Sequence, residues 1–117
     1  MVTDFLIRIK NAALARKKEV GLTPGKKVRA VAQAMKRLGF LDEVEKEKVL
    51  ITYKNKKPRL MNLKLITKPG LRIYMGVSDL EKKKGPSVYL VSTPKGILSD
   101  REAIKQRVGG EVIVEIT

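Results

Sequence analysis

The sequence predicts an α+β protein of two small subdomains. An N-terminal α-β-α-β-β subdomain is expected over residues 1–67, and a mostly β subdomain with one short helix over residues 68–117. In the first half, apolar residues recur at helical spacing in two stretches. In the second half, apolar and polar residues mostly alternate, which is the period of a strand. Thr67-Lys68-Pro69-Gly70 separates the halves, because Pro-Gly makes a turn and interrupts the sheet pattern.

The first helix is expected over residues 4 to about 16, with Thr3 as its N-cap. Ile7 and Leu14 lie opposite its apolar face, where a second layer buries them or they stay exposed. A short strand is expected over residues 19–22. The apolar face itself consists of Phe5, Leu6, Ile9, Ala12 and Ala13.

Thr23-Pro24 predicts the start of a second helix, as an N-cap followed by proline at the first helical position. Gly39 should end this helix after Leu38, with Val28, Val31, Met35 and Leu38 facing inward. Residues 40–53 are typical of a hairpin, residues 54–58 of a polar turn and residues 60–66 of another strand. The inner face of the hairpin should hold Leu41, Val44, Val49, Ile51 and Tyr53.

The second half predicts short elements. Residues 71–74 form a strand, residues 78–87 a polar connection, and residues 88–91 and 96–98 the two arms of a hairpin. Ser99 followed by Glu102 is the signature of a capping box and predicts a helix start there. Gly109-Gly110 ends that helix, and residues 111–116 form the closing strand.

The charge of the chain is strongly positive. Lys and Arg number 26 against 12 Asp and Glu, a formal net charge of +14, which favours a polyanionic partner such as nucleic acid or an anionic membrane. No apolar run is long enough to span a bilayer, and the N-terminus lacks the apolar core of a signal peptide. We therefore expect a soluble intracellular protein whose partner is nucleic acid and not a membrane.

Two missing residue types narrow the function. The chain has no Cys and no His, which excludes disulfides, thiolate chemistry and the commonest general base and metal ligand. We expect no enzyme activity, no cofactor and no metal site. Aromatic residues are only 4%, so contact with phosphates, 2′-hydroxyls and the shape of a folded RNA is favoured over broad base stacking.

The segment between the two hairpin strands carries groups suited to RNA. Ser92 and Thr93 supply hydroxyls, Lys95 a positive charge, and Gly96 a backbone that a sugar-phosphate strand can approach closely. An ordinary hairpin turn explains the same residues, because Ser, Thr, Pro and Gly are common in turns.

Several segments together resemble one family. Residues 90–96 are similar to a loop that usually reads Ser-Thr-Ser-Lys-Gly, residues 68–74 to a Lys-Pro-Gly segment ending in Tyr, and residues 4–11 to an N-terminal helix. Gly39-Phe40-Leu41 is similar to the turn between the second helix and the following strand of that family. In this order, the segments resemble bacterial-type small-subunit ribosomal protein eight. Departures include Pro94 for the second serine of the loop and Arg107 where a small residue is frequent.

The resemblance implies a primary rRNA-binding protein, monomeric outside the ribosome, that binds the central domain of 16S rRNA, helps assemble the platform of the small subunit and adjoins neighbouring small-subunit proteins. Tyr74 is open to interpretation as an aromatic at the edge of the core, and Glu111 as a carboxylate that organises the glycine turn. The implied RNA-binding residues are Ser92, Thr93, Lys95, Gly96, Tyr74, Glu111, Gly110, Arg107, Arg8, Lys10, Asn11 and Lys26.

Three other functions remain open. A free-standing RNA-binding translational regulator would use the same fold. A DNA-binding module would use the helix of residues 23–38, although a strand-like segment separates it from the first helix. An enzyme would need Asp42, Glu43, Glu45 and Glu47 to collect a metal; on a strand the three glutamates would share one face, but a solvated rim is the simpler interpretation.

Overall fold

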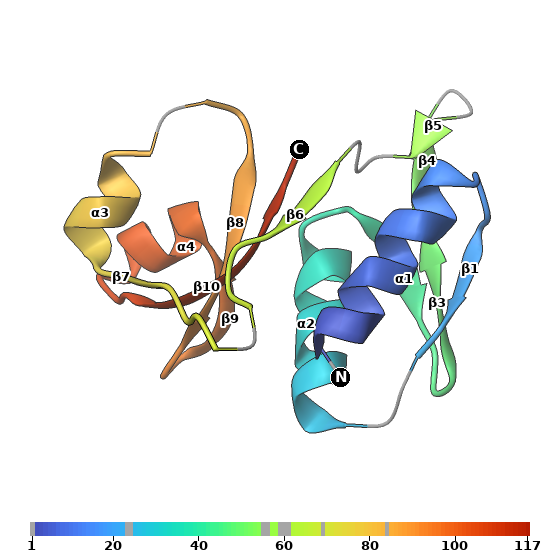
Figure 1. Ribbon diagram of the computed structural model, residues 1–117, viewed down its shortest axis with the longest axis horizontal. Helices are drawn as coiled ribbons and strands as arrows, with labels where there is room; N and C mark the ends of the chain where they lie inside the picture. The colour runs from blue at the N-terminus through green and yellow to red at the C-terminus, as the bar shows by residue number, and fades with distance from the viewer. Residues whose placement is uncertain (1, 23–24, 55–56, 59–61, 69, 84) are drawn as a thin grey trace. The chain divides into compact units, whose positions relative to one another are not determined.

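The computed structural model of the chain describes residues 2–22, 25–54, 57–58, 62–68, 70–83 and 85–117. The chain divides into unit 1, Met1–Asn62, and unit 2, Leu63–Thr117 (Figure 1). The boundary expected from the sequence lay after residue 67, so residues 63–67 fall in unit 2. The α+β class is confirmed, with helices and antiparallel sheets in both units.

Unit 1 begins with α1 (Val2–Leu14), whose predicted apolar face is buried throughout. Thr3 was wrongly predicted as the N-cap, because the helix already includes it and keeps Asp4 in its first turn. The helix also ends earlier than predicted, since Arg16 turns to a φ of 57°. There the N–H of Lys17 donates to the carbonyl of Ala12 at 2.8 Å and that of Arg16 to Ala13 at 3.1 Å, a Schellman motif.

The outer side of α1 carries Ile7 and Leu14, the two apolar residues whose burial the sequence did not determine. Ile7 is 40% exposed and Leu14 is 68% exposed, so no second layer of described residues covers them.

Helix α2 (Lys26–Arg37) buries Val28, Val31 and Met35 as predicted, while Leu38 is half-buried at its C-cap. Its predicted N-cap, Thr23-Pro24, lies outside the described residues, and Gly25 precedes the first turn. Gly39, at a φ of 90°, ends the helix in a second Schellman motif, in which the N–H of Phe40 donates to the carbonyl of Met35 at 2.9 Å.

The sheet of unit 1 has the order β1-β3-β2 and is antiparallel; its strands are β1 (Glu19–Gly21), β3 (Lys48–Ile51) and β2 (Leu41–Val44). The predicted hairpin of residues 40–53 is therefore present, with Leu41, Val49 and Ile51 buried. β4 (Tyr53–Lys54) pairs with β5 (Lys57–Pro58) in a separate ribbon. Tyr53 is thus not on the inner face of the hairpin, and its hydroxyl donates to the carbonyl of Lys17.

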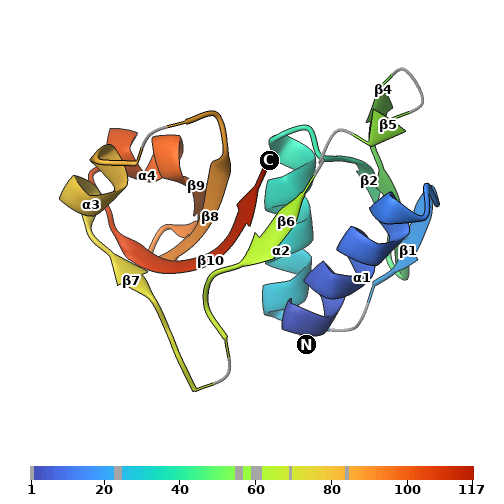
Figure 2. The ribbon, with the colours of Figure 1, turned by 45° about the horizontal axis from the view of Figure 1, so that its top comes forward.

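The sheet of unit 2 is built around its last strand. Its order is β6-β10-β8-β9, and β7 also pairs with β10 (Figure 2). These strands are β6 (Leu63–Leu65), β7 (Tyr74–Met75), β8 (Val88–Thr93), β9 (Gly96–Ser99) and β10 (Gly110–Ile116). The strand predicted over residues 60–66 of the first half therefore belongs, in its described part, to the second sheet.

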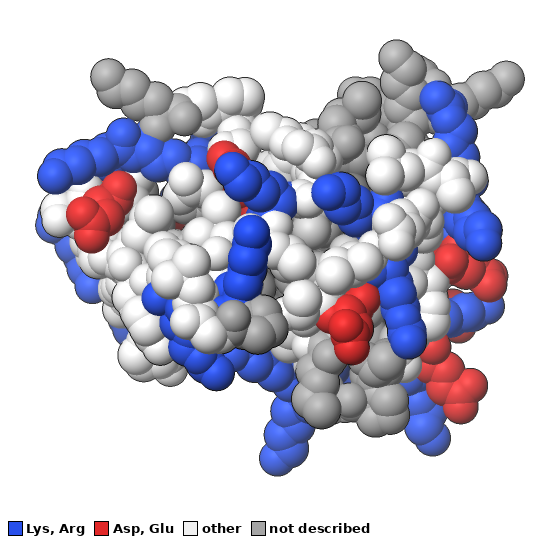
Figure 3. All heavy atoms as spheres, in the orientation of Figure 1, with Lys and Arg blue, Asp and Glu red and all other residues white. Residues whose placement is uncertain are grey.

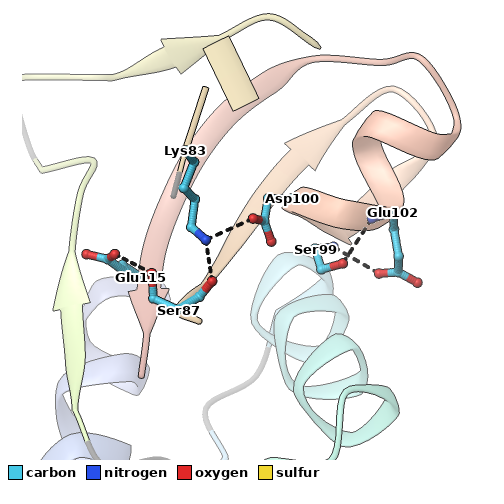
Figure 4. Close-up of polar contacts among 6 residues, drawn as sticks. All are labelled: Lys83, Ser87, Ser99, Asp100, Glu102 and Glu115. Carbon is cyan, nitrogen blue, oxygen red and sulfur yellow. Dashed lines mark hydrogen bonds and ion pairs between the residues drawn. The ribbon is translucent and has the colours of Figure 1, made fainter. Parts of the chain in front are cut away.

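Helices α3 (Val77–Glu81) and α4 (Asp100–Lys105) cover the unit 2 core, which consists of Leu80, Val91, Leu98, Ala103 and Val112. The capping box at α4 is confirmed: Glu102 N–H donates to Ser99 Oγ at 3.1 Å, and Ser99 N–H donates to Glu102 Oε1 at 2.9 Å (Figure 4). α3 corrects the prediction of a polar connection over residues 78–87. A single buried apolar residue, Leu80, gives too little periodicity to reveal it.

Inside unit 2 lies a network of buried charges (Figure 4). Lys83 Nζ lies 3.1 Å from Asp100 Oδ2, and these side chains are only 8% and 7% exposed. The same ammonium donates to the carbonyl of Ser87, whose hydroxyl donates to Glu115 Oε2 at 2.6 Å. Lys83, which stands in a lysine run typical of a solvated connection, is thus a structural cation that ties the end of α3 to α4.

Candidate nucleic-acid interface

The hairpin of β8 and β9 carries the first group of predicted site residues. Thr93 pairs with Gly96, so Ser92 and Thr93 belong to a strand, and only Pro94 and Lys95 form the turn. The predicted loop was therefore too long. Thr93 Oγ1 donates to the carbonyl of Gly96 at 2.8 Å and accepts the N–H of Lys95 at 3.1 Å. The hydroxyl of Thr93 thus holds the turn, while Lys95 and Gly96 are exposed at its tip.

Three predicted residues meet in one row across the sheet. Glu111 of β10 pairs with Tyr74 of β7 on one side and with Ser92 of β8 on the other. Directly paired residues project from the same face of a sheet, so these three side chains are neighbours. Val91 and Val112, the adjacent residues, belong to the core under the helices. The row therefore lies on the face of the sheet away from α3 and α4.

The row combines one exposed aromatic ring with one nearly buried carboxylate. Tyr74 is 66% exposed, which argues against the interpretation as an aromatic of the core edge. The Glu111 side chain is only 10% exposed, and its Oε2 lies 3.7 Å from Nη1 of Arg72, which is 67% exposed. Glu111 therefore pairs with the guanidinium of Arg72 in the same row that holds Tyr74.

Arg72 is a functional candidate that the sequence reasoning missed. A signal was available, because Arg72 and Tyr74 are two residues apart and share a face if the segment is extended. The segment is held against β10: Thr67 Oγ1 donates to the carbonyl of Val112 at 2.6 Å, and Val112 N–H donates to the carbonyl of Ile73 at 2.9 Å.

Gly109 and Gly110, where β10 begins, let the backbone approach its neighbours closely beside this row. A Cβ on Gly110 would lie 2.0 Å from the carbonyl oxygen of Ser92, and one on Gly109 would lie 2.5 Å from that of Met75. No side chain fits at such distances. Close approach of backbones, rather than an unusual dihedral angle, therefore requires both glycines and leaves no room for Gly110 to be replaced.

Arg107 occupies the residue after the C-cap of α4 in the left-handed conformation, with a φ of 60°. Val108 N–H donates to the carbonyl of Ala103 at 3.0 Å, so α4 ends in a Schellman motif, as α1 does at Arg16. Glycine normally takes this position, since a left-handed residue with a side chain costs about 1–2 kcal/mol. The exposed guanidinium of Arg107 thus projects from a strained position close to the glycine pair.

The N-terminal candidates belong to unit 1 and are described within it alone. Arg8 and Asn11 are exposed on neighbouring positions of α1 and line one surface hollow. Lys10 is half-buried and lies on a different side of the helix. Lys26 is exposed at the first residue of α2.

Positive side chains are spread over the surface, as the face in Figure 3 shows. The acidic segment after α2 has local partners: Asp42 Oδ1 accepts the hydroxyl of Thr52 at 2.8 Å, Glu43 lies 3.7 Å from Lys36, and Glu45 lies 3.9 Å from Lys48. A hydrogen bond and the charge of Glu19, 3.1 Å away, raise the pKa of Lys48.

The metal-binding alternative fails on this geometry. β2 ends at Val44, so Glu43, Glu45 and Glu47 do not share a strand face as that interpretation required. Within the described ranges, no three acidic residues are grouped so that they could hold a metal ion. Nor does any helix in the described part of the chain have the length and apolarity to cross a membrane.

Comparison with known proteins finds related sequences over the whole chain. The family model described as Ribosomal protein S8 matches residues 1–117. Proteins named "Small ribosomal subunit protein uS8" are 38% identical in Roseiflexus castenholzii and 39% identical in Persephonella marina. Each alignment covers 96% of this chain, with 92% and 93% of the respective relative. With 38% identity, the Mycoplasmopsis pulmonis protein aligns over 98% of this chain and 94% of its own. The chain therefore belongs to the ribosomal protein S8 family.

Proposed function

We propose that the chain is a structural constituent of the small ribosomal subunit and a primary binder of the central domain of 16S rRNA, acting in the cytoplasm. In this role it helps assemble the platform of the subunit beside neighbouring ribosomal proteins, and it is a monomer before assembly. Its family and the name of its relatives support the place in the small subunit. The row of Tyr74, Glu111 and Ser92 is the observation that carries direct contact with RNA.

The row offers three kinds of contact to a folded RNA. The exposed ring of Tyr74 can stack on an unpaired base, and the hydroxyl of Ser92 can reach a 2′-hydroxyl or a phosphate. Arg72, paired with Glu111, supplies a planar cation two residues before Tyr74 in the chain. A carboxylate in an RNA site is otherwise unfavourable, so its pairing with Arg72 gives Glu111 a positioning role.

The hairpin tip adds the sugar-phosphate contacts. Lys95 contributes one positive charge, and Gly96 has open space on its Cα among the described residues, so a backbone strand of RNA can approach it closely. Pro94 removes one backbone donor from this turn, which leaves fewer hydrogen bonds at the tip than the family loop offers. The net charge of +14 contributes attraction that does not depend on sequence.

Competition binding at about physiological salt tests the proposal. A labelled hairpin from the central domain of 16S rRNA is challenged with duplex RNA and duplex DNA of equal length. We expect strong preference for the hairpin, because shape-specific contacts survive where nonspecific attraction is partly screened. Equal competition by all three would show that positive charge alone accounts for the binding.

Two variants of the hairpin tip refine this test. Lys95→Ala should weaken binding mildly and lower the slope of log Kd against log salt by about 0.7–0.9, the value for one phosphate contact. Gly96→Val should reduce binding more, because it blocks close approach and because the φ of Gly96, 109°, disfavours a side chain. Negligible effects from both would exclude the tip from the interface.

The free-standing regulator is distinguished by location. We expect the protein to co-sediment with small subunits after washing in high salt, as a resident constituent does. Recovery only in the soluble fraction, together with tight binding to a messenger RNA, would favour the regulator.

A further inference from the structure

Unit 1 has a surface hollow between α1 and β1, the blue elements of Figure 1, with a volume of about 370 Å³. Its floor includes Ala12 and Val20, both buried, and its edge is formed by Arg8, Asn11 and Ala15, all exposed. Every lining residue belongs to unit 1, so the hollow is complete within that unit.

The walls of the hollow are fixed in place. Tyr53 donates to the carbonyl of Lys17, which is one lining residue, and the Lys48 ammonium lies 3.1 Å from Glu19, another. Lys17 N–H also closes the Schellman motif that ends α1. The shape therefore exists before a ligand arrives, and binding does not require these segments to be ordered first.

The polar groups at the edge are available and suited to a nucleobase. No described residue makes an ion pair or a side-chain hydrogen bond with Arg8 or with the carboxamide of Asn11. A carboxamide presents a donor and an acceptor side by side, the pattern that pairs with the edge of a base. A guanidinium plane stacks on a base, and small alanine side chains leave room for a flat ring.

We propose that this hollow receives one unstacked base of the RNA that the chain binds. The inference rests on the proposed function and adds to it a second, base-reading contact in unit 1. A phosphate alone would not use the apolar floor, and an apolar protein side chain would leave the carboxamide of Asn11 and the charge of Arg8 unpaired. A single nucleotide uses the floor through its base and the cation through its phosphate or its ring.

The test uses two variants that leave the net charge unchanged. Ala15→Phe fills the hollow, and Asn11→Ala removes the group that reads the base edge. Lys18→Ala is the matched control, because it removes a charge from the same segment outside the lining. Each full-length protein is titrated against the 16S central-domain fragment and against a series of that fragment with one unpaired nucleotide at a time made abasic.

We expect one abasic position to weaken binding by the unchanged protein about tenfold, the usual range for one stacked base. Ala15→Phe and Asn11→Ala should weaken binding of the intact fragment by a similar factor and lose sensitivity to that abasic position. Their salt dependence should stay unchanged, whereas Lys18→Ala should lower the salt slope and keep the abasic sensitivity. Circular dichroism melting confirms that each variant is folded.

Equal abasic sensitivity of the unchanged protein and both variants would overturn the inference while leaving the proposed function intact. Failure of the unchanged protein to prefer the fragment would instead remove the proposed function itself. If the variants bind RNA normally but no longer enter small subunits, the hollow holds a protein group and the base contact is refuted.

Discussion

Unit 1 and unit 2 differ in the burial of their ion pairs and in the space around their glycines. The ion pairs described in unit 1 are exposed: the side chains of Lys48 and Glu19 are 43% and 59% exposed. Gly21 in the same unit has room for a side chain, since no described atom beyond its chain neighbours lies within 4 Å of where a Cβ would stand. In unit 2 the pair of Lys83 and Asp100 is buried, and Gly110 abuts the backbone of Ser92. Unit 1 thus depends mainly on its apolar core, and unit 2 also on specific polar and glycine positions.

The difference predicts that unit 2 tolerates fewer substitutions. A surface ion pair contributes little to stability, whereas breaking a buried one leaves an uncompensated charge. Unfolding in urea, followed through the amide signals of each unit by NMR, separates the two responses in one protein.

Gly110→Ala should have the largest effect. Its Cβ would lie 2.0 Å from a backbone oxygen, so β10 and β8 must move apart, and we expect unit 2 to lose more than about 4 kcal/mol of its free energy of unfolding. Gly21→Ala in β1 is the matched control and should be nearly neutral. A mild Gly110→Ala phenotype would show that the strands separate easily at this point.

Lys83→Met should follow, destabilising unit 2 by about 3–5 kcal/mol, because Asp100 is left buried without its cation. The double variant Lys83→Met with Asp100→Leu should recover most of the loss, since two apolar groups replace the pair. Lys48→Met in unit 1 should change little. If Lys83→Met and Lys48→Met cost the same, burial of the charge does not distinguish the units.

Tyr53→Phe should have a smaller effect, about 0.5–1 kcal/mol at neutral pH, through loss of the hydrogen bond to Lys17. Burial raises the pKa of Tyr53, partly opposed by the charge of Arg16. The stability that this group contributes is therefore full below pH 10 and is lost as the pH rises through the higher pKa of the folded state.

Measuring the stability of each unit at increasing pH checks this prediction. Tyr53→Phe should remove the part of the alkaline loss of stability that Tyr53 causes, and it should do so in unit 1 only. Burial first, and then the charges of Glu115 and Asp100, raise the pKa of Tyr89 in unit 2. Its alkaline loss should persist in the variant, and a change in both units would mean that Tyr53 acts beyond unit 1.

Arg107→Gly should have the smallest effect, within about 0.5 kcal/mol, since relief of the left-handed strain is offset by greater freedom in the unfolded chain and by loss of a cation at a helix end. Gly39→Ala, at the equivalent position after α2, should cost about 1 kcal/mol. RNA affinity should fall for Arg107→Gly if the guanidinium of Arg107 contacts a phosphate. A large gain in stability would show that the arginine is more strained than its φ indicates.

The elements that the sequence predicted well are those with strong local signals. The apolar face of α1, the stop at Gly39 and the capping box of Ser99 and Glu102 depend on neighbours in the chain, and all are present. The short α3 was missed because only Leu80 reaches the core, and the membership of β6 was missed because strand pairing with β10 is a long-range choice.

The candidate site shows the same division. Residue type suggested Ser92, and the family resemblance added Tyr74 and Glu111 to the same surface, but their common row follows from the register of three strands, which composition does not reveal. The Thr93 hydroxyl suggested an RNA donor, whereas local geometry engages it in the turn. The hollow beside α1 depends on how the chain returns as β1, and no local pattern predicts it.

The central place of β10 sets the order in which the protein can mature during translation. Unit 1 has all of its elements once residue 62 has left the ribosome that makes it, and domains generally fold as they emerge. Unit 2 has no complete sheet until residues 110–116 follow, since β6, β7 and β8 all pair with them. A nascent chain halted before that strand would therefore carry a folded first half and an unassembled second half, whose unpaired strands are open to chaperones and proteases.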